Sequence, residues 1–256
     1  MIISDLLRSG SKILKNCKVQ SHLLDSEIML SSLLKKKKEQ IIINSEKKVP
    51  RSTINDFNKL IIRRSKKEPL AYILKKKEFW SKSFFVNRNT LIPRPETELL
   101  CDMVIKKIKD KKPFILDLGT GTGCILLSIL SENKKAKGLG IDISKKAIEV
   151  AKKNSYSHGL NKRAVFLTRS LDKINNYKFD LIVSNPPYIK TSDIKNLSDD
   201  VRKFEPKIAL DGGKDGLDVI KKVIYKSKTI LKKFGLLALE IGHGQYYKVS
   251  KILKEQ

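Results

Sequence analysis

The sequence contains 256 residues, of which 40% are hydrophobic and 32% are charged. This balance allows a folded core and excludes a wholly disordered chain. No run of about 18 apolar residues occurs, which excludes a transmembrane helix, and the N-terminus lacks the apolar segment of a secretory signal. The three cysteines and three histidines show neither disulfide nor metal-ligand spacing. We therefore expect a soluble, cytoplasmic protein without a metal site.

The chain is strongly basic, with a formal net charge of +27. Such a charge favours anionic partners, above all nucleic acid. Lysine, however, supplies 45 of the 54 basic residues, whereas the readout of base edges relies on arginine. We therefore expect only weak, nonspecific contact with RNA, and the composition leaves the oligomeric state open.

Residues 1–75 have the spacing of short amphipathic helices. A first helix is expected at 4–15, a second at 21–34 and a third at 52–65. The apolar residues of the second segment recur at helical spacing: Leu23, Leu24, Ile28, Met29, Leu33 and Leu34. These segments predict a small helical bundle, which is too small for a catalytic cleft of its own.

Residues 76–92 are expected to connect this bundle to a larger domain, residues 93–256. The alternating aromatic segment 78–86 predicts a short β-hairpin. Beyond it, strands are expected at 114–118, 138–143, 165–168, 179–184 and 236–241, and helices at 124–131, 145–158, 217–232 and 246–254. This alternation predicts an α/β fold with a mostly parallel, doubly wound sheet, whose ligands bind at the carboxyl ends of the strands.

A glycine-rich turn follows the first of these strands and opens a helix. Its glycines allow a sharp turn and a close backbone approach to a ligand, but their spacing matches neither the dinucleotide fingerprint nor the phosphate-binding loop. An acidic residue ends the next strand, where a carboxylate can accept hydrogen bonds from two ribose hydroxyls. The candidate cofactor residues are Asp117, Gly119, Thr120, Gly121, Thr122, Gly123 and Asp142.

The tetrapeptide Asn185-Pro186-Pro187-Tyr188 follows another buried strand. Its two prolines restrict the backbone and lack N–H groups, which predicts a rigid shelf. The side-chain oxygen of Asn185 and the carbonyl of Pro186 would then be two fixed acceptors suited to a planar NH2 group. Tyr188 supplies an aromatic face against which this group can lie.

These motifs together resemble the HemK/PrmC family, the protein-(glutamine-N5) methyltransferases that modify the Gly-Gly-Gln glutamine of class I peptide chain release factors. Two further segments carry the resemblance: Leu91-Ile-Pro-Arg-Pro-Glu-Thr-Glu98 and Phe204-Glu-Pro-Lys-Ile-Ala-Leu-Asp-Gly-Gly-Lys-Asp-Gly-Leu217. The resemblance implies a Rossmann-like class I methyltransferase domain that uses S-adenosylmethionine and a helical bundle that docks the release factor.

The resemblance also implies roles for individual residues. The glycine loop would line the methionine part of the cofactor, Asp142 would hold the ribose, and Asn185 to Tyr188 would bind the substrate glutamine, with Asn185 also bordering the cofactor. Asn185 and Pro186 would be the catalytic pair. The segment Arg94-Pro95-Glu96-Thr97-Glu98 would lie close to the pocket and help to shape the substrate channel, with Arg94 contacting the substrate. Arg169-Ser170 stands where the family usually has an acidic residue near the adenine, and Ser170 is the cofactor contact expected there. The family fold continues with two more strands after the last helix. The sequence stops at Gln256 in that helix, so we expect these strands to be missing and the strand at 236–241 to lie at an exposed sheet edge.

Three alternative functions remain open. A ribosomal protein glutamine methyltransferase shares every core motif. An adenine-N6 DNA methyltransferase also uses Asn-Pro-Pro-Tyr, although the Lys-rich helical segment before residue 90 lacks the features of base readout. A non-catalytic RNA-binding protein with a degenerate methyltransferase fold would fit the charge, and it would bind no S-adenosylmethionine.

Overall fold

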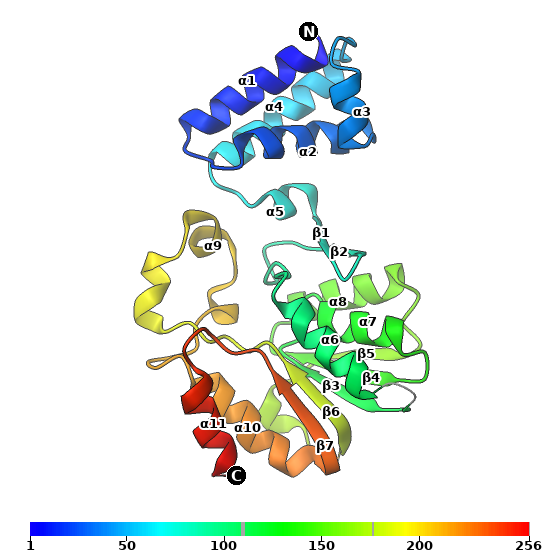
Figure 1. The fold of residues 1–256 in the computed structure, drawn as a ribbon, viewed down its shortest axis with the longest axis vertical. Coiled ribbons are helices and arrows are strands. Elements are labelled where there is room, and N and C mark those ends of the chain that lie inside the picture. Colours follow the sequence, from blue (N-terminus) through cyan, green and yellow to red (C-terminus); the bar gives the residue numbers. More distant parts are fainter. Residues whose placement is uncertain (109–110, 176, 256) are drawn as a thin grey trace. The chain divides into compact units, whose positions relative to one another are not determined.

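A computed structural model describes residues 1–108, 111–175 and 177–255 of the chain. Its contacts divide the chain into two compact units, whose elements are labelled in Figure 1. The helical unit comprises Met1–Lys75 together with Asp199–Phe204, and the α/β unit comprises Lys76–Ser198 together with Glu205–Gln256. Each unit has a hydrophobic core of its own.

The helical unit contains short helices, and its core is formed by the helices within residues 1–75. The helices are α1 (Ile3–Asn16), α2 (His22–Leu34), α3 (Lys38–Ile43), α4 (Arg51–Ser65), α5 (Leu70–Leu74) and α9 (Asp199–Phe204). Leu14, Met29 and Phe57 are fully buried in this core. Gly10 allows α1 and α4 to approach closely, because a Cβ there would lie 2.7 Å from the Phe57 ring.

The helices expected at 4–15, 21–34 and 52–65 are confirmed as α1, α2 and α4. The expected apolar face of α2 is wrong in part, because Leu23 and Leu24 are 62% and 46% exposed. Met29 is buried as expected, and Leu30, which was not expected, is buried beside it. The six-residue α3 and the five-residue α5 were not expected, since so short a segment carries too few residues for a periodic pattern.

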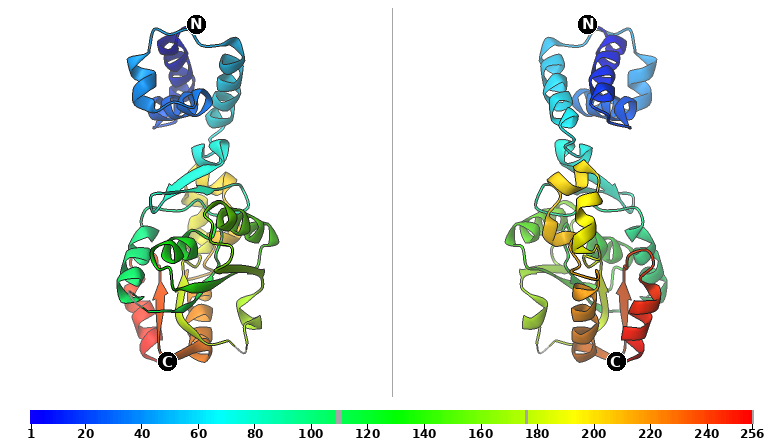
Figure 2. Two further views of the ribbon diagram at one scale, coloured as in Figure 1. Left: turned by 90° about the vertical axis from the view of Figure 1, so that its right-hand side faces the viewer. Right: turned by 90° about the vertical axis from the view of Figure 1, so that its left-hand side faces the viewer.

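The α/β unit contains an antiparallel hairpin and a parallel sheet (Figures 1 and 2). The hairpin expected at 78–86 is confirmed as β1 (Lys76–Phe79) and β2 (Lys82–Phe85). The sheet consists of β3 (Phe114–Leu118), β4 (Lys137–Asp142), β5 (Ala164–Thr168), β6 (Phe179–Ser184) and β7 (Leu231–Leu239). The strand order is β5-β4-β3-β6-β7 and each described pair is parallel, so the order reverses between β3 and β6. Ligands bind at such a reversal in open α/β sheets.

Helices cover both faces of this sheet. On one face lie α6 (Thr97–Ile108), α7 (Cys124–Glu132) and α8 (Lys145–Ser157). On the other face lies α10 (Asp218–Ile230), and α11 (Tyr246–Lys254) packs against α10. Short 3₁₀ segments lie at Leu171–Lys173, Thr191–Asn196 and Lys207–Ala209. The fold class expected from the sequence, an α/β class I methyltransferase-like architecture, is confirmed.

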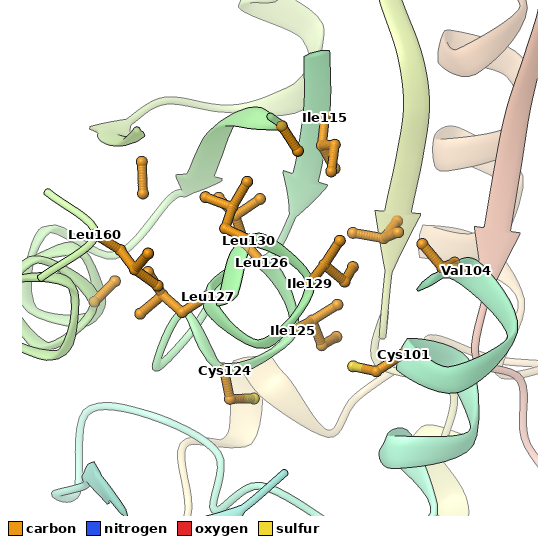
Figure 3. Close-up of a cluster of buried hydrophobic side chains, with 14 of the residues drawn as sticks. Cys101, Val104, Ile115, Cys124, Ile125, Leu126, Leu127, Ile129, Leu130 and Leu160 are labelled. Carbon is orange, nitrogen blue, oxygen red and sulfur yellow. The ribbon is translucent and has the colours of Figure 1, made fainter. Parts of the chain in front are cut away.

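Helix α7 is apolar on every side because it is surrounded by other elements. Figure 3 shows its side chains around the helix axis, with Cys101 and Val104 of α6 and Ile115 of β3 beside them. Residues Cys124 to Leu130 are all buried. This packing fixes the start of α7, where the glycine loop ends.

The C-terminal part of the sheet differs from the expected boundaries. The helix expected to reach residue 232 ends at Ile230, and the strand expected at 236–241 is the longer β7. β7 is an edge strand of the described sheet, and Phe234 on it is 90% exposed. Helix α6 was not expected at all. In the described part of the chain, no helix combines the length and the apolar composition that crossing a membrane requires.

Candidate active site

The register of the parallel sheet brings three loops to one edge. Leu118 at the end of β3 pairs with Ile141 of β4 on one side and with Ser184 of β6 on the other. The chain therefore leaves the sheet side by side at Gly119 and Asn185, with the end of β4 next to them. The Ser184 hydroxyl, which is buried, donates to the Leu118 carbonyl at 2.8 Å and ties the two strand ends together.

The glycine loop between β3 and α7 is held by the neighbouring strand. The amides of Gly119 and Thr120 both donate to the carbonyl of Ile141, at 3.0 and 2.9 Å. Gly119, Gly121 and Gly123 have φ of +70°, +53° and +79°, a region that favours glycine. A Cβ at Gly119 would meet nothing within 4 Å, so open space lies beside the loop where a ligand can approach the backbone.

Asp142 closes the other side of this loop. Its Oδ2 accepts from the amide of Gly121 at 3.0 Å, and its Oδ1 accepts from the amide of Ser144 at 2.9 Å. Burial raises the pKa of Asp142, and these two backbone donors oppose that effect. A carboxylate has about four acceptor positions, so each oxygen can accept a further hydrogen bond from a hydroxyl in the cavity.

Asp117 lies beneath the loop and is fully buried. Its Oδ2 accepts a 2.6 Å hydrogen bond from the hydroxyl of Thr120. Burial raises the pKa of Asp117 to about 7, although the Thr120 hydroxyl acts in the opposite direction. The carboxyl therefore titrates near neutral pH and supports the loop from below.

The shelf Asn185-Pro186-Pro187-Tyr188 is anchored by the segment that follows it. The amide of Ile189 donates to Leu210, and the amide of Gly212 donates to Ile189, at 3.1 and 2.8 Å. Gly212 packs so closely that a Cβ there would lie 2.8 Å from the Pro187 carbonyl oxygen. The side chain of Gln245 donates to the Tyr188 carbonyl at 3.1 Å. The prolines and these contacts leave the shelf little freedom.

Two acceptors of the shelf remain open. Asn185 donates with Nδ2 to the hydroxyl of Thr97 at 3.2 Å, which directs its amide oxygen the other way. Among the described residues, neither Asn185 Oδ1 nor the Pro186 carbonyl accepts a hydrogen bond. Tyr188 is half-buried, and its hydroxyl donates to Glu240 at 3.2 Å. Burial and the charge of Glu240 raise the pKa of Tyr188 to about 12, so the phenol stays protonated.

A cavity of about 440 Å³ joins the glycine loop, Asp142 and the shelf. The expected site residues that line it are Arg94, Gly119, Thr120, Gly121, Thr122, Asp142, Asn185, Pro186 and Pro187. Those that do not line it are Asp117, Gly123, Ser170 and Tyr188. Arg169 and Leu171, on either side of Ser170, do line the cavity, so this short segment borders it through those two side chains.

Arg94 is engaged by a residue that was not expected in the site. Its Nη2 donates to Oε1 of Glu205 at 2.6 Å, and Oε2 of Glu205 accepts from the amide of Ile92 at 3.0 Å. The side chain of Glu205 is 1% exposed. Glu240 also escaped sequence reasoning as a site residue, whereas Thr97 belongs to the segment 94–98 that the family resemblance placed close to the pocket. One signal in the sequence could have identified Glu240 as a site residue. This residue directly follows the apolar segment Leu236-Leu-Ala-Leu239, where a solvent-exposed acidic side chain is not expected.

Sequence comparison places the chain in a family. A model for the PrmC N-terminal domain matches residues 5–74, and a model for the methyltransferase small domain matches residues 95–203. A release factor glutamine methyltransferase of Caulobacter vibrioides is 38% identical over 94% of this chain and 84% of that protein. One of Clostridium acetobutylicum is 38% identical over 100% of this chain and 91% of that protein. This chain belongs to the release factor glutamine methyltransferase family. The family expected from the motifs is thereby confirmed.

Solved structures agree on the fold. The ribosomal protein L11 methylase from Lactobacillus delbrueckii subsp. bulgaricus matches 66% of this chain and 72% of that chain, with a TM-score of 0.50 and 20% identity. At that identity the match supports the class I methyltransferase fold alone. The relatives and the methyltransferase small domain match show that the chain is a methyltransferase, and this class implies the use of S-adenosylmethionine.

The residues of the cavity fit this cofactor. The open space beside Gly119 and Gly121 is one that side chains at these positions would fill. Asp142 offers spare acceptor positions at the end of the strand next to the loop, as a ribose requires. The sulfonium donor carries a positive charge, and the carboxyl group of Asp142 lines the cavity beside the loop.

Proposed function

We propose that this chain transfers a methyl group from S-adenosylmethionine to the side-chain amide nitrogen of the glutamine in the Gly-Gly-Gln motif of class I release factors. The observation that carries the proposal is the pair of open acceptors, Asn185 Oδ1 and the Pro186 carbonyl, on a rigid shelf beside the glycine loop. A carboxamide NH2 has two hydrogens, so two fixed acceptors can orient it. The relatives named release factor glutamine methyltransferases support the choice of substrate.

The chemistry requires orientation more than a base. The amide nitrogen of glutamine is a poor nucleophile, because its lone pair is delocalised into the carbonyl group. Asn185 and Pro186 hold both hydrogens and so direct the nitrogen at the methyl group in line, which converts an encounter into a near-attack geometry. The same two oxygens stabilise the positive charge that develops on the nitrogen. When bound, S-adenosylmethionine would supply the methyl group from its sulfonium centre: the carbon–sulfur bond breaks as the nitrogen–carbon bond forms, and the nitrogen then releases one proton to water.

The remaining residues divide between cofactor and substrate. We assign the methionine part of the cofactor to residues 119–123, supported from below by Asp117, and the ribose to Asp142. The adenine is assigned to the segment 169–171, in which Arg169 and Leu171 line the cavity and Ser170 lies between them. Pro187 and Tyr188 complete the glutamine site, and Arg94 shapes its entrance through its ion pair with Glu205.

We further propose that the helical unit docks the release factor. The methylated release factor then acts in translation termination, in the cytoplasm. The PrmC N-terminal domain match covers this part of the chain and supports the assignment. The net charge of +27 supports weak, nonspecific contact with RNA close to this substrate.

The test is a methylation assay with the full chain, labelled S-adenosylmethionine and a purified class I release factor. Mass spectrometry should find one methyl group on the glutamine of Gly-Gly-Gln. A release factor with that glutamine replaced by alanine serves as the control and should stay unlabelled. Asn185→Ala should lose turnover while calorimetry still detects cofactor binding. Wild-type turnover by Asn185→Ala would end the orientation mechanism.

The other functions are tested by repeating the assay with ribosomes or with DNA in place of the release factor, and by calorimetry with S-adenosylmethionine. Label in a ribosomal protein instead of the release factor would assign the substrate of the sister enzymes. Label on adenine in DNA would make the chain a nucleic-acid methyltransferase. A chain that binds no S-adenosylmethionine by calorimetry would be a non-catalytic binding protein.

A further inference from the structure

A relay of hydrogen bonds, from Glu240 through Thr97 to Asn185, lies behind the shelf, on the side of Asn185 opposite its open oxygen. Tyr188 and Thr97 each donate a hydroxyl to one oxygen of Glu240, at 3.2 Å to Oε1 and 2.6 Å to Oε2. The Thr97 oxygen in turn lies 3.2 Å from Nδ2 of Asn185. The amide of Glu240 donates to the Ser184 carbonyl at 3.0 Å, which fixes the carboxylate next to the start of the shelf.

The donor and the acceptor of each hydrogen bond in this relay follow from counting protons. An ionised carboxylate only accepts hydrogen bonds, so both hydroxyl groups must donate to Glu240. Thr97 has one hydroxyl proton, and donation to Glu240 uses it. Toward Asn185 the Thr97 oxygen can therefore only accept, and the group that faces it must be the NH2 of the asparagine. Thr97 is 2% exposed, so water cannot readily supply another partner.

We infer that Glu240 and Thr97 are positioning residues that set the orientation of the Asn185 amide, so that its oxygen faces the cavity. An asparagine side chain can rotate by half a turn with little change in shape, which exchanges its oxygen and its NH2. In the reversed orientation a donor would face the substrate amide, which itself donates. The charge of Glu240, relayed through one hydroxyl, decides between the two. This role rests on the proposed function of Asn185.

The first test compares two substitutions of Thr97. Thr97→Val removes the hydroxyl and keeps the shape, and kcat should fall by up to about 100-fold. Because the defect concerns the fraction of correctly oriented Asn185, the dissociation constant of S-adenosylmethionine should stay unchanged. Thr97→Ser restores the hydroxyl and should restore kcat. A matched control is Ser227→Ala, which removes a buried hydroxyl that donates to the Val223 carbonyl within α10 and should leave kcat unchanged.

A second test reverses the direction of the hydrogen bonds in the relay. Asn185→Asp cannot donate to Thr97, so two carboxylates compete for one hydroxyl proton. In the double variant Asn185→Asp/Glu240→Gln, the new glutamine can donate to Thr97, and Thr97 can donate to the aspartate. The double variant should therefore be more active than Asn185→Asp, although Glu240→Gln alone should lower kcat. Losses that multiply in the double variant would overturn the inference.

A readout independent of turnover separates this inference from the proposed function. The side-chain NH2 of Asn185, identified by its disappearance from the ¹⁵N spectrum in Asn185→Asp, should shift and exchange faster with solvent in Thr97→Val. It should return to its wild-type position in Thr97→Ser. If the wild-type chain methylates no release factor but this signal behaves as described, the proposed function fails and the relay stands. An unchanged signal in Thr97→Val refutes the relay, whatever the substrate is.

Discussion

The backbone amide of Gly121 donates a 3.0 Å hydrogen bond to the carboxylate of Asp142, and this contact couples the glycine loop to the end of β4. The other carboxylate oxygen accepts from the amide of Ser144, at the start of α8. One side chain therefore orders the loop, caps the turn into a helix and presents acceptors to the cavity. The cofactor site proposed here depends on these three roles of Asp142.

Asp142→Asn should weaken S-adenosylmethionine binding roughly 10- to 100-fold. Asparagine has one acceptor oxygen, so it can no longer accept from both amides and from hydroxyl groups of the cofactor. The loss of a hydrogen bond to a charged group is worth about 1.5–3 kcal/mol, which corresponds to this change in affinity. Isothermal calorimetry on the purified variant measures it directly.

Asp180→Asn is the matched control for this substitution. Asp180 also accepts from a backbone amide, that of Phe114 at 2.8 Å, and it pairs with Lys232. It lies near the start of β6, at the edge of the sheet away from the cavity. Its replacement should leave the cofactor affinity unchanged, and equal losses in the two variants would contradict a specific role for Asp142.

Asp117 should make the stability of the free protein depend on pH. Its pKa rises to about 7 in the folded chain, from an ordinary value of 3.8. Between these values the folded state holds a proton that the unfolded state releases, so the free energy of unfolding falls as the pH rises through this interval. Above it both states are ionised and the slope disappears.

Asp117→Asn should remove this contribution, because the amide does not titrate and its oxygen can still accept from Thr120. Urea unfolding at about pH 5 and about pH 8 should show a smaller loss of stability in the variant than in the wild type. At the higher pH the variant should be the more stable of the two by about 1–3 kcal/mol. This is the cost of burying an ionised carboxylate with too few hydrogen-bond donors. Parallel pH profiles for the two proteins would refute the assignment.

Gly212→Ala should impair turnover by displacing the shelf. A Cβ at Gly212 would meet the Pro187 carbonyl oxygen and the Tyr188 Cα at 2.8 Å, and backbone atoms cannot move aside like a flexible side chain. A displacement of the shelf near 1 Å corresponds to a loss of kcat of about 100-fold. Cofactor affinity should persist, because the glycine loop does not contact this position.

Gly159→Ala provides the comparison for that variant. Gly159 has φ of +66°, and nothing lies within 4 Å of the Cβ that alanine would add. The substitution should cost roughly 1 kcal/mol of stability through backbone strain and leave kcat at the wild-type value. Steady-state kinetics on both variants decide the matter, and similar losses of kcat would exclude a steric effect on the shelf.

Arg94→Met should destabilise the α/β unit, because the buried carboxylate of Glu205 loses one of its partners, the Arg94 guanidinium. The pair is 2.6 Å long, and the Arg94 side chain is 31% exposed, so solvent weakens the effect. We expect a loss of about 1–3 kcal/mol in denaturant unfolding. The double variant Arg94→Met/Glu205→Gln should recover part of it, since the amide carries no charge. A double variant less stable than either single one would argue against this ion pair.

Much of the fold follows from local sequence patterns. The apolar runs at 114–118 and 179–184 are strands because they are buried on both faces, and the alternation with helices implies a parallel sheet. Helix α6 escaped prediction although it packs against α7, since its buried residues follow a proline-rich segment that indicates a loop. The end of α10 was placed two residues too late, because Leu231 directly follows the apolar Ile230 of the helix although it already begins β7.

The sequence alone determined the glycine loop, the acidic residue after the next strand and the rigid tetrapeptide, because each is a short segment whose chemistry follows from its own residue types. Only the tertiary structure decided which way the Asn185 amide faces. Thr97 and Glu240 lie 143 residues apart, and they meet at Asn185 because β6 and β7 pair in parallel and α6 packs beside their ends. A hydrogen-bond donor is assigned only when all of its partners are in place, and strand pairing over long separations supplies those partners.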